Sequence, residues 1–185
     1  MEPPAITRHR RPFLAPLWLI LLATAAVVGV AWAFYLSATT TVVFLVRPVE
    51  KDPGTIEDPP LSPEGEESAQ RLAHMFGGTA AAGGIDAIYE SDERRAQQTA
   101  APLVQQSHRA PVVFKAADAR SAAGRALHDH RGGGVLIIAS GAVLSQISQE
   151  LTGADLPPAL PDEPDLIYVV SVPSVGHAHV VRFRF

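Results

Sequence analysis

The chain has 185 residues, which is enough for one domain of ordinary size and an appendage. It has no cysteine, which excludes disulfides, thiolate chemistry and zinc sites built on cysteine. The chain has a formal net charge of −4 and so lacks the excess of basic residues that is typical of nucleic-acid-binding proteins. We therefore expect no nucleic-acid partner.

Apolar residues are concentrated near the amino terminus. Residues 13–36 contain no formally charged side chain and are rich in leucine, alanine and valine. At a rise of about 1.5 Å per residue, a helix of this length crosses a hydrocarbon core about 30 Å thick. We therefore predict a transmembrane helix over residues 13–36, which attaches the protein to a membrane.

The flanks of this segment predict its orientation. Arg8, Arg10 and Arg11 precede it, whereas residues 37–41 carry no charge. The positive-inside rule therefore predicts a cytoplasmic basic tail over residues 1–12 and an extracytoplasmic domain over residues 39–185. A cleaved signal peptide is the alternative, because Ala-Trp-Ala at residues 31–33 has the small-x-small pattern of a cleavage site. The apolar run exceeds the usual length of about 7–15 residues for a signal peptide, so we favour the anchor.

The domain begins with a strand and a helix. Five consecutive apolar residues, 42–46, are too few for a typical helix and predict a strand buried on both faces. After a loop over residues 51–60, Ser62 is a good N-cap and Pro63 suits the first helical position. Glycines at 77 and 78 are expected to end this helix.

Strand and helix signals then alternate to the end of the chain. A helix is predicted after Asp92, with Pro102 kinking it or ending it early, and another over residues 119–130. A further helix is predicted to turn Val143, Leu144, Ile147 and Leu151 inward and to end at Gly153. Further strands are predicted over residues 85–89, 112–114, 135–139, 167–172 and 178–185, the last two forming a hairpin. This order predicts an α/β fold: a three-layer α/β/α arrangement with a mostly parallel sheet and a C-terminal antiparallel hairpin.

Four motifs resemble those of a known family. Residues 44–51, Phe-Leu-Val-Arg-Pro-Val-Glu-Lys, are similar to the first signature of the histidine phosphatase (phosphoglycerate mutase-like) superfamily, Leu-Val-Arg-His-Gly/Ala-Glu. Residues 60–65 resemble its Pro-Leu-Thr-x-x-Gly motif, and residues 91–100 its Ser-x-x-x-Arg-Ala-x-x-Thr-Ala motif. Residues 139–141, Ala-Ser-Gly, lie where the family has Gly-His-Ser/Gly. The resemblance covers residues 41–185.

The resemblance implies a phosphate site without its usual chemistry. In the family, the first histidine attacks phosphorus, while the second histidine and two arginines stabilise the charge. Pro48 and Ser140 stand at the two histidine positions, and Arg47 and Arg95 match the arginines. Proline has no nucleophilic side chain and serine brings no positive charge. The resemblance thus implies an inactive domain, with no catalytic residue, that keeps Arg47, Arg95 and Ser140 to bind a phosphorylated or anionic small molecule, or a protein partner.

An active phosphohydrolase that uses a non-histidine route is the alternative. Ser140 is a poor nucleophile because no histidine or lysine adjoins it in the sequence. Asp118 could transfer a proton, but we favour its use as the N-cap of the next helix. The two arginines could instead form structural ion pairs, for example with Glu50 or Asp92.

Two pairs of histidines have the spacing of metal ligands. A His-x-His pattern occurs at His128 and His130 and again at His177 and His179. The first pair lies at a polar helix end, where histidine suits the negative pole of the helix dipole, and the second begins an edge strand next to a turn. We therefore predict no metal and no cofactor.

Overall fold

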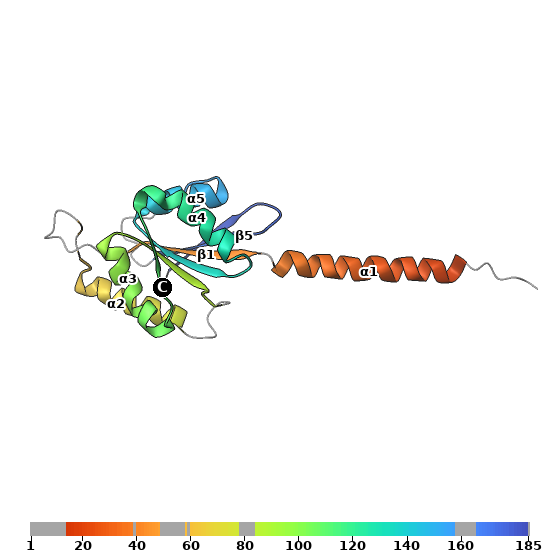
Figure 1. Ribbon diagram of the computed structural model, residues 1–185, viewed down its shortest axis with the longest axis horizontal. Coiled ribbons are helices and arrows are strands. Elements are labelled where there is room, and N and C mark those ends of the chain that lie inside the picture. Colours follow the sequence, from red (N-terminus) through yellow and green to blue (C-terminus); the bar gives the residue numbers. More distant parts are fainter. Residues whose placement is uncertain are drawn as a thin grey trace, which may run out of the picture. The chain divides into compact units, whose positions relative to one another are not determined.

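The computed structural model describes residues 14–38, 40–48, 58, 60–77, 84–157 and 166–184 (Figure 1). The chain divides into two units, Met1–Ser37 and Ala38–Phe185, which are described separately. The predicted tail over residues 1–12, and Glu50, lie outside the described residues.

In the first unit the structure describes one helix, α1, at Leu14–Ala38. Its segment Leu17–Tyr35 has a mean hydropathy of 2.3 and is exposed throughout. Length and composition suffice for a membrane span, although a signal sequence near an amino terminus has the same properties. The structure confirms an apolar helix at the predicted position, and its topology stays a prediction.

The second unit is built on a six-stranded sheet in the order β3-β2-β4-β1-β5-β6. β1 pairs in parallel with β4, β4 with β2, and β2 with β3, whereas β5 runs antiparallel to both β1 and β6. Five strands therefore share one direction and β5 alone is reversed. The strands are β1 (Thr41–Val46), β2 (Ala87–Ser91), β3 (Val112–Phe114), β4 (Gly134–Ile138), β5 (Leu166–Val172) and β6 (His179–Arg184).

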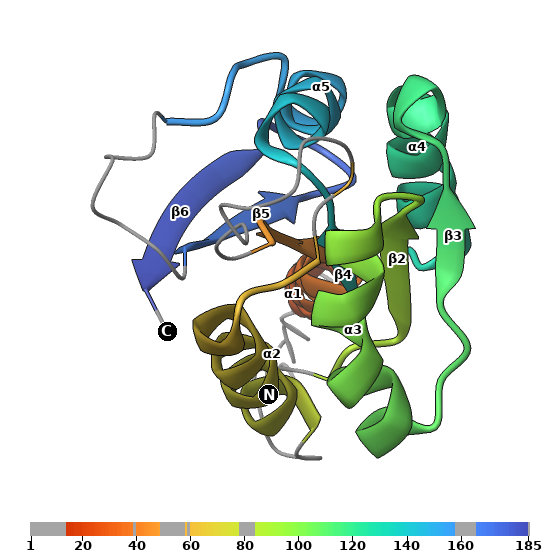
Figure 2. The ribbon, with the colours of Figure 1, turned by 90° about the vertical axis from the view of Figure 1, so that its left-hand side faces the viewer.

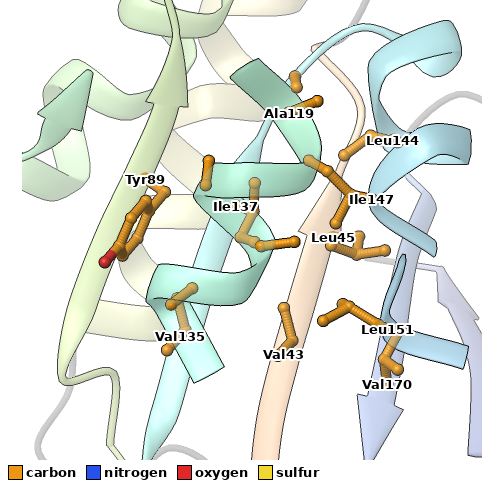
Figure 3. Close-up of a cluster of buried hydrophobic side chains, with 14 of the residues drawn as sticks. Val43, Leu45, Tyr89, Ala119, Val135, Ile137, Leu144, Ile147, Leu151 and Val170 are labelled. Carbon is orange, nitrogen blue, oxygen red and sulfur yellow. The ribbon is translucent and has the colours of Figure 1, made fainter. Parts of the chain in front are cut away.

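Helices cover both faces of this sheet (Figure 2). One face packs against α2 and α3 through a cluster that includes Phe44 and Val46, and the other packs against α4 and α5 through Val43 and Leu45. Figure 3 shows the second cluster, in which Leu45 of β1 lies close to Ile147 of α5. The alternation of β1 side chains explains its burial on both faces and confirms the three-layer α/β/α prediction. The helices are α2 (Pro63–Gly77), α3 (Arg94–Ser107), α4 (Ala119–Asp129) and α5 (Gly141–Thr152).

Several local predictions are confirmed. The Ser62 hydroxyl accepts a hydrogen bond from the Gly65 N–H at 3.1 Å, so Ser62 caps α2. Helix α5 ends at Gly153, which has a positive φ of 74°. The hairpin of β5 and β6 is also present.

Three local predictions need correction. Strand β2 covers Ala87–Ser91 instead of residues 85–89, because Glu90 and Ser91 also pair with β3 and are buried. Helix α3 does not end early at Pro102 but continues to Ser107, and Leu103 is buried one residue beyond the proline, which anchors this last part to the core. The kink at Pro102 stays a prediction. Asp118 occupies the N-cap position of α4, but a 3-10 turn at Ala116–Asp118 precedes it and its exposed side chain makes no capping hydrogen bond.

Candidate functional site

The candidate site lies at the edge of the sheet where β1, β2 and β4 end. Because these strands are parallel, the segments that follow them meet at one edge. Arg47 and Pro48 follow β1, Ser140 follows β4, and Arg95 lies in the first turn of α3 after β2. A cleft of about 310 Å³ is lined by Arg47, Pro48, Arg95, Ser140, Gly141 and Ala142. The structure thus brings together all the residues that the sequence singled out for this site.

The amino end of α5 contributes to the same cleft. Ser140 is the N-cap of α5, and its carbonyl accepts a hydrogen bond from the Leu144 N–H at 2.8 Å. Its side chain makes no capping bond, and the N–H groups of the first turn have no partner within a helix. A Cβ placed on Gly141 would lie 4.0 Å from Nε of Arg47, so this guanidinium reaches the start of the helix. Free N–H groups, the positive helix pole and a guanidinium together favour an anion.

Neither arginine of the cleft has an ion pair within the part of the chain that the structure describes. Arg47 is exposed, and Nε of Arg95 is buried without a hydrogen-bond partner. The ion pair considered between Arg95 and Asp92 is not formed. The alternative pairing with Glu50 falls outside the described residues.

Three of the four buried polar atoms that lack a hydrogen-bond partner in the described part of the chain lie near the start of α3, where Arg95 lines the cleft; the fourth, the hydroxyl of Ser107, lies in the last turn of α3. Besides Nε of Arg95, the hydroxyl of Ser91 and Oε2 of Glu93 are buried without a hydrogen-bond partner. A buried polar atom without a partner typically costs about 1–3 kcal/mol, so native proteins have few of them. Three within five residues of sequence indicate a place that bound water or a polar ligand would satisfy.

Glu90 is a nearby residue that the sequence analysis missed. It is only 5% exposed, and the described residues give it no hydrogen-bond partner. Burial raises the pKa of its carboxyl from 4.5 to about 7. The sequence offered one signal for Glu90, which is a glutamate directly before Ser91, the first residue of the motif over residues 91–100, in a segment that continues as a strand.

The remaining candidates lie away from the cleft. Among the residues that the structure describes, its lining includes neither Asp118 nor a histidine. Nδ1 of His128 lies 3.0 Å from Oδ1 of Asp129 on the surface, and the ring of His130 packs edge-on against Tyr89. His177 and His179 are exposed, and the described residues contain no cluster of three metal-ligating side chains.

A second pocket lies at the opposite edge of the sheet, where β1 begins. Its volume is about 290 Å³, and its lining includes Thr41, Leu127, His128, Arg131 and Ser174. The carboxyl end of α4 contributes to this pocket, so the nearest helix pole is negative. None of the predicted phosphate-binding residues lines it.

Comparison with known proteins finds a family profile that matches the first half of the domain and solved structures that share its fold. A sequence profile of the Histidine phosphatase superfamily (branch 1) matches residues 47–117, which include Arg47 and Arg95. No curated protein sequence matches the chain.

Solved structures match over most of the chain at low identity. The protein histidine phosphatase SixA complexed with tungstate is 16% identical, with a TM-score of 0.60 over 77% of this chain and 96% of that one. A mycobacterial glucosyl-3-phosphoglycerate phosphatase is 18% identical in its native structure, with a TM-score of 0.57 over 71% and 90%. The same phosphatase in complex with VO3 is 16% identical, with a TM-score of 0.58 over 80% and 99%. The second unit is therefore histidine-phosphatase-like in fold.

Proposed function

We propose that this protein is a membrane-anchored, histidine-phosphatase-like domain that binds a phosphorylated or otherwise anionic ligand without hydrolysing it. The observation that carries this proposal is the cleft in which Arg47, Arg95 and the first turn of α5 converge. The buried Nε of Arg95, which lacks a partner, supports an anion as the missing acceptor. The proposed phosphate-binding residues are Arg47, Arg95 and Ser140.

The structural relatives support the chemistry of the ligand. Tungstate in SixA and VO3 in the mycobacterial phosphatase are oxyanions that resemble phosphate. In this chain, two guanidiniums offer forked donors suited to such oxygens, and the α5 N–H groups add further donors. A phosphate ester, or a phosphorylated protein partner, is the ligand class that fits this set.

The residues at the family's histidine positions support loss of hydrolysis. Pro48 stands at the nucleophile position, and its side chain has no lone pair to attack phosphorus. The hydroxyl of Ser140 would need a base, yet the described residues that line the cleft include no histidine, lysine or carboxylate. Binding without turnover is therefore the reading that this chemistry favours.

The proposal includes the anchor. Residues 13–36 would cross the membrane once, with residues 1–12 in the cytoplasm and residues 39–185 on the other side. Protease treatment of intact cells, or of spheroplasts, should remove the domain and leave the amino-terminal tail protected. A domain released into solution without α1 would support the signal-peptide alternative.

Binding and hydrolysis can be separated with the full chain in detergent. We expect inorganic phosphate to raise the melting temperature, with no turnover of a generic aryl phosphate. Arg95→Ala should weaken phosphate binding about 10–100-fold, because a charge-assisted hydrogen bond of this kind is worth about 1.5–3 kcal/mol. The matched control is Arg131→Ala, which removes an arginine from the opposite pocket and should leave phosphate affinity unchanged.

Turnover that disappears in Arg47→Ala would favour the active phosphohydrolase. Absence of any effect of phosphate on the melting temperature of the wild type would reject the anion site.

A further experiment uses the double variant Pro48→His with Ser140→His, which should gain aryl phosphatase activity if the arginines still hold the phosphate in place. Each single variant serves as its control, because both histidines take part in the family's mechanism.

A further inference from the structure

The last strand carries a third arginine to the edge of the candidate site. Strand β6 runs in the same direction as β1, and its last residue, Arg184, pairs with Leu166 of β5. The next residue of β5, Ile167, pairs with Val46. Leu166 is therefore level with Arg47, and Arg184 is level with both. Two strand spacings separate the backbones of Arg47 and Arg184, which is about 9–10 Å.

Both arginines belong to the same face of the sheet. Leu45 and Leu166 lie in the core cluster under α4 and α5, and Val180 packs against that cluster. Side chains two residues apart on a strand share a face. Arg47 is therefore on the face of Leu45, and Arg184, like Arg182, is on the face of Val180. The contact of Arg47 with the start of α5 agrees with this assignment.

Arg184 is available for a ligand. It is exposed, and no hydrogen bond or ion pair joins it to another described residue. A charge on an edge strand can also serve only to discourage pairing with another sheet, and that explanation predicts no effect on ligand choice. That explanation does not account for the position of Arg184, which is level with Arg47 and on the face of the sheet that α5 covers.

We propose that Arg184 forms a second anion subsite beside the cleft, so that the preferred ligand carries two anionic groups roughly 10 Å apart. The inference rests on the proposed function, because the first anion is the one held by Arg47 and Arg95. The ligand class is then a bisphosphate, or a phosphate ester with a distant carboxylate. Arg184 acts as a specificity-determining residue, and simple phosphate monoesters bind without it.

Calorimetry on the full chain in detergent tests this with two matched probes, hexyl phosphate and hexane-1,6-diol bisphosphate. Wild-type protein should bind the bisphosphate about fivefold more tightly, the effect of one exposed ion pair, after correction for the twofold statistical advantage of two equivalent ends. Arg184→Gln should abolish this preference and leave the affinity for hexyl phosphate unchanged. The control is Arg125→Gln, which removes the same charge from an exposed position on α4 outside the cleft.

The outcomes separate the two proposals. A wild-type protein that binds hexyl phosphate but shows no preference for the bisphosphate overturns the second subsite alone. A preference that survives in Arg184→Gln also overturns the subsite, because Arg184 would then not be its cause. A preference that Arg125→Gln removes equally overturns it too, because the charge would then act at long range. Failure of inorganic phosphate and both probes to bind overturns the proposed function together with the inference.

Discussion

The two edges of the sheet carry pockets of similar size with different chemistry. The carboxyl-edge cleft has a volume of about 310 Å³ and the amino-edge pocket about 290 Å³, and each has arginine in its lining. The cleft receives the amino end of α5, whereas the other pocket receives the carboxyl end of α4. Of the four buried polar atoms without a partner in the described residues, three lie beside the cleft, at Ser91, Glu93 and Arg95, and one, the hydroxyl of Ser107, lies in the last turn of α3.

This difference teaches that an arginine in a cavity does not by itself define an anion site. In a parallel α/β fold each helix begins at the carboxyl edge and ends at the amino edge, so the positive poles gather at one edge and the negative poles at the other. His74 and His128 occupy the last turns of α2 and α4, where a cation is favoured. We therefore expect substitutions at the amino edge to change stability without changing phosphate binding, and substitutions of the residues that line the cleft to change phosphate binding.

The largest effect is expected at Gly134, at the start of β4. A Cβ on this residue would overlap the carbonyl oxygen of Gly84, and the backbone of Gly134 also exchanges hydrogen bonds with Asp86. Gly134→Ala should lower the free energy of unfolding by about 3 kcal/mol, measured by urea denaturation of the full chain in detergent. The protein that remains folded at low temperature should bind phosphate normally.

A glycine in open surroundings provides the control for that variant. Gly124 lies inside α4 with nothing within 4 Å of an added Cβ. Gly124→Ala should therefore stabilise the domain by about 0.5–1 kcal/mol through helix propensity. A weaker phosphate affinity in folded Gly134→Ala would contradict the view that the amino edge is structural and the carboxyl edge binds the ligand.

The second effect concerns the buried carboxyl of Glu90 at the carboxyl edge. Its pKa is raised from 4.5 to about 7, so the folded state favours the protonated form. Stability should therefore be unaffected by this group below pH 4.5, fall as the pH rises from 4.5 to 7, and stay reduced above 7. Glu90→Gln should stabilise the domain by roughly 2 kcal/mol at pH 8 and by almost nothing at pH 4.

The measurement is the difference in free energy of unfolding between Glu90→Gln and wild type across this pH range. Other acids titrate equally in both proteins, so the difference isolates Glu90. A gain that does not change with pH would mean that the carboxyl is solvated or paired in solution. A gain confined to high pH would show that a group near the cleft is retained at a cost in stability.

Much of this architecture follows from the sequence, because its signals are strong locally. The apolar run of β1, the cap at Ser62 and the glycine after α5 each determine one element through nearby residues. The co-location of Arg47, Arg95 and Ser140 was predicted from the resemblance, since parallel strands bring their carboxyl ends together.

What escaped prediction depends on neighbours distant in sequence. Burial of Glu90 in β2 requires strands on both sides, and no local signal reports them. The level of Arg184 beside Arg47 depends on two strand registers, which hydrophobic alternation alone does not determine. The missing cap at Asp118 has a local cause instead, because a 3-10 turn at Ala116–Asp118 precedes α4.

A third prediction compares two serines in equivalent N-cap positions. Ser62 caps α2 through its hydroxyl, whereas the hydroxyl of Ser140 makes no capping bond to α5. Ser62→Ala should cost about 1 kcal/mol of stability, and Ser140→Ala only a few tenths, the lower end for an N-cap. Phosphate affinity should fall severalfold in Ser140→Ala alone, since Ser140 lines the cleft and Ser62 does not. Equal losses of stability would mean that Ser140 caps α5 in solution and is not reserved for a ligand.

A small gain in stability, together with a loss of binding, is expected at Ala142, in the first turn of α5 and exposed in the cleft. A carboxylate here would interact with the positive helix pole, so Ala142→Asp should stabilise the domain by about 0.5 kcal/mol. The same charge would occupy the place of the anion, and phosphate affinity should fall about tenfold. Ala142→Asn is the neutral control and should weaken binding much less. A gain in stability combined with a loss of binding at one position would separate the two demands on this edge, whereas unchanged phosphate affinity would show that the anion does not approach α5.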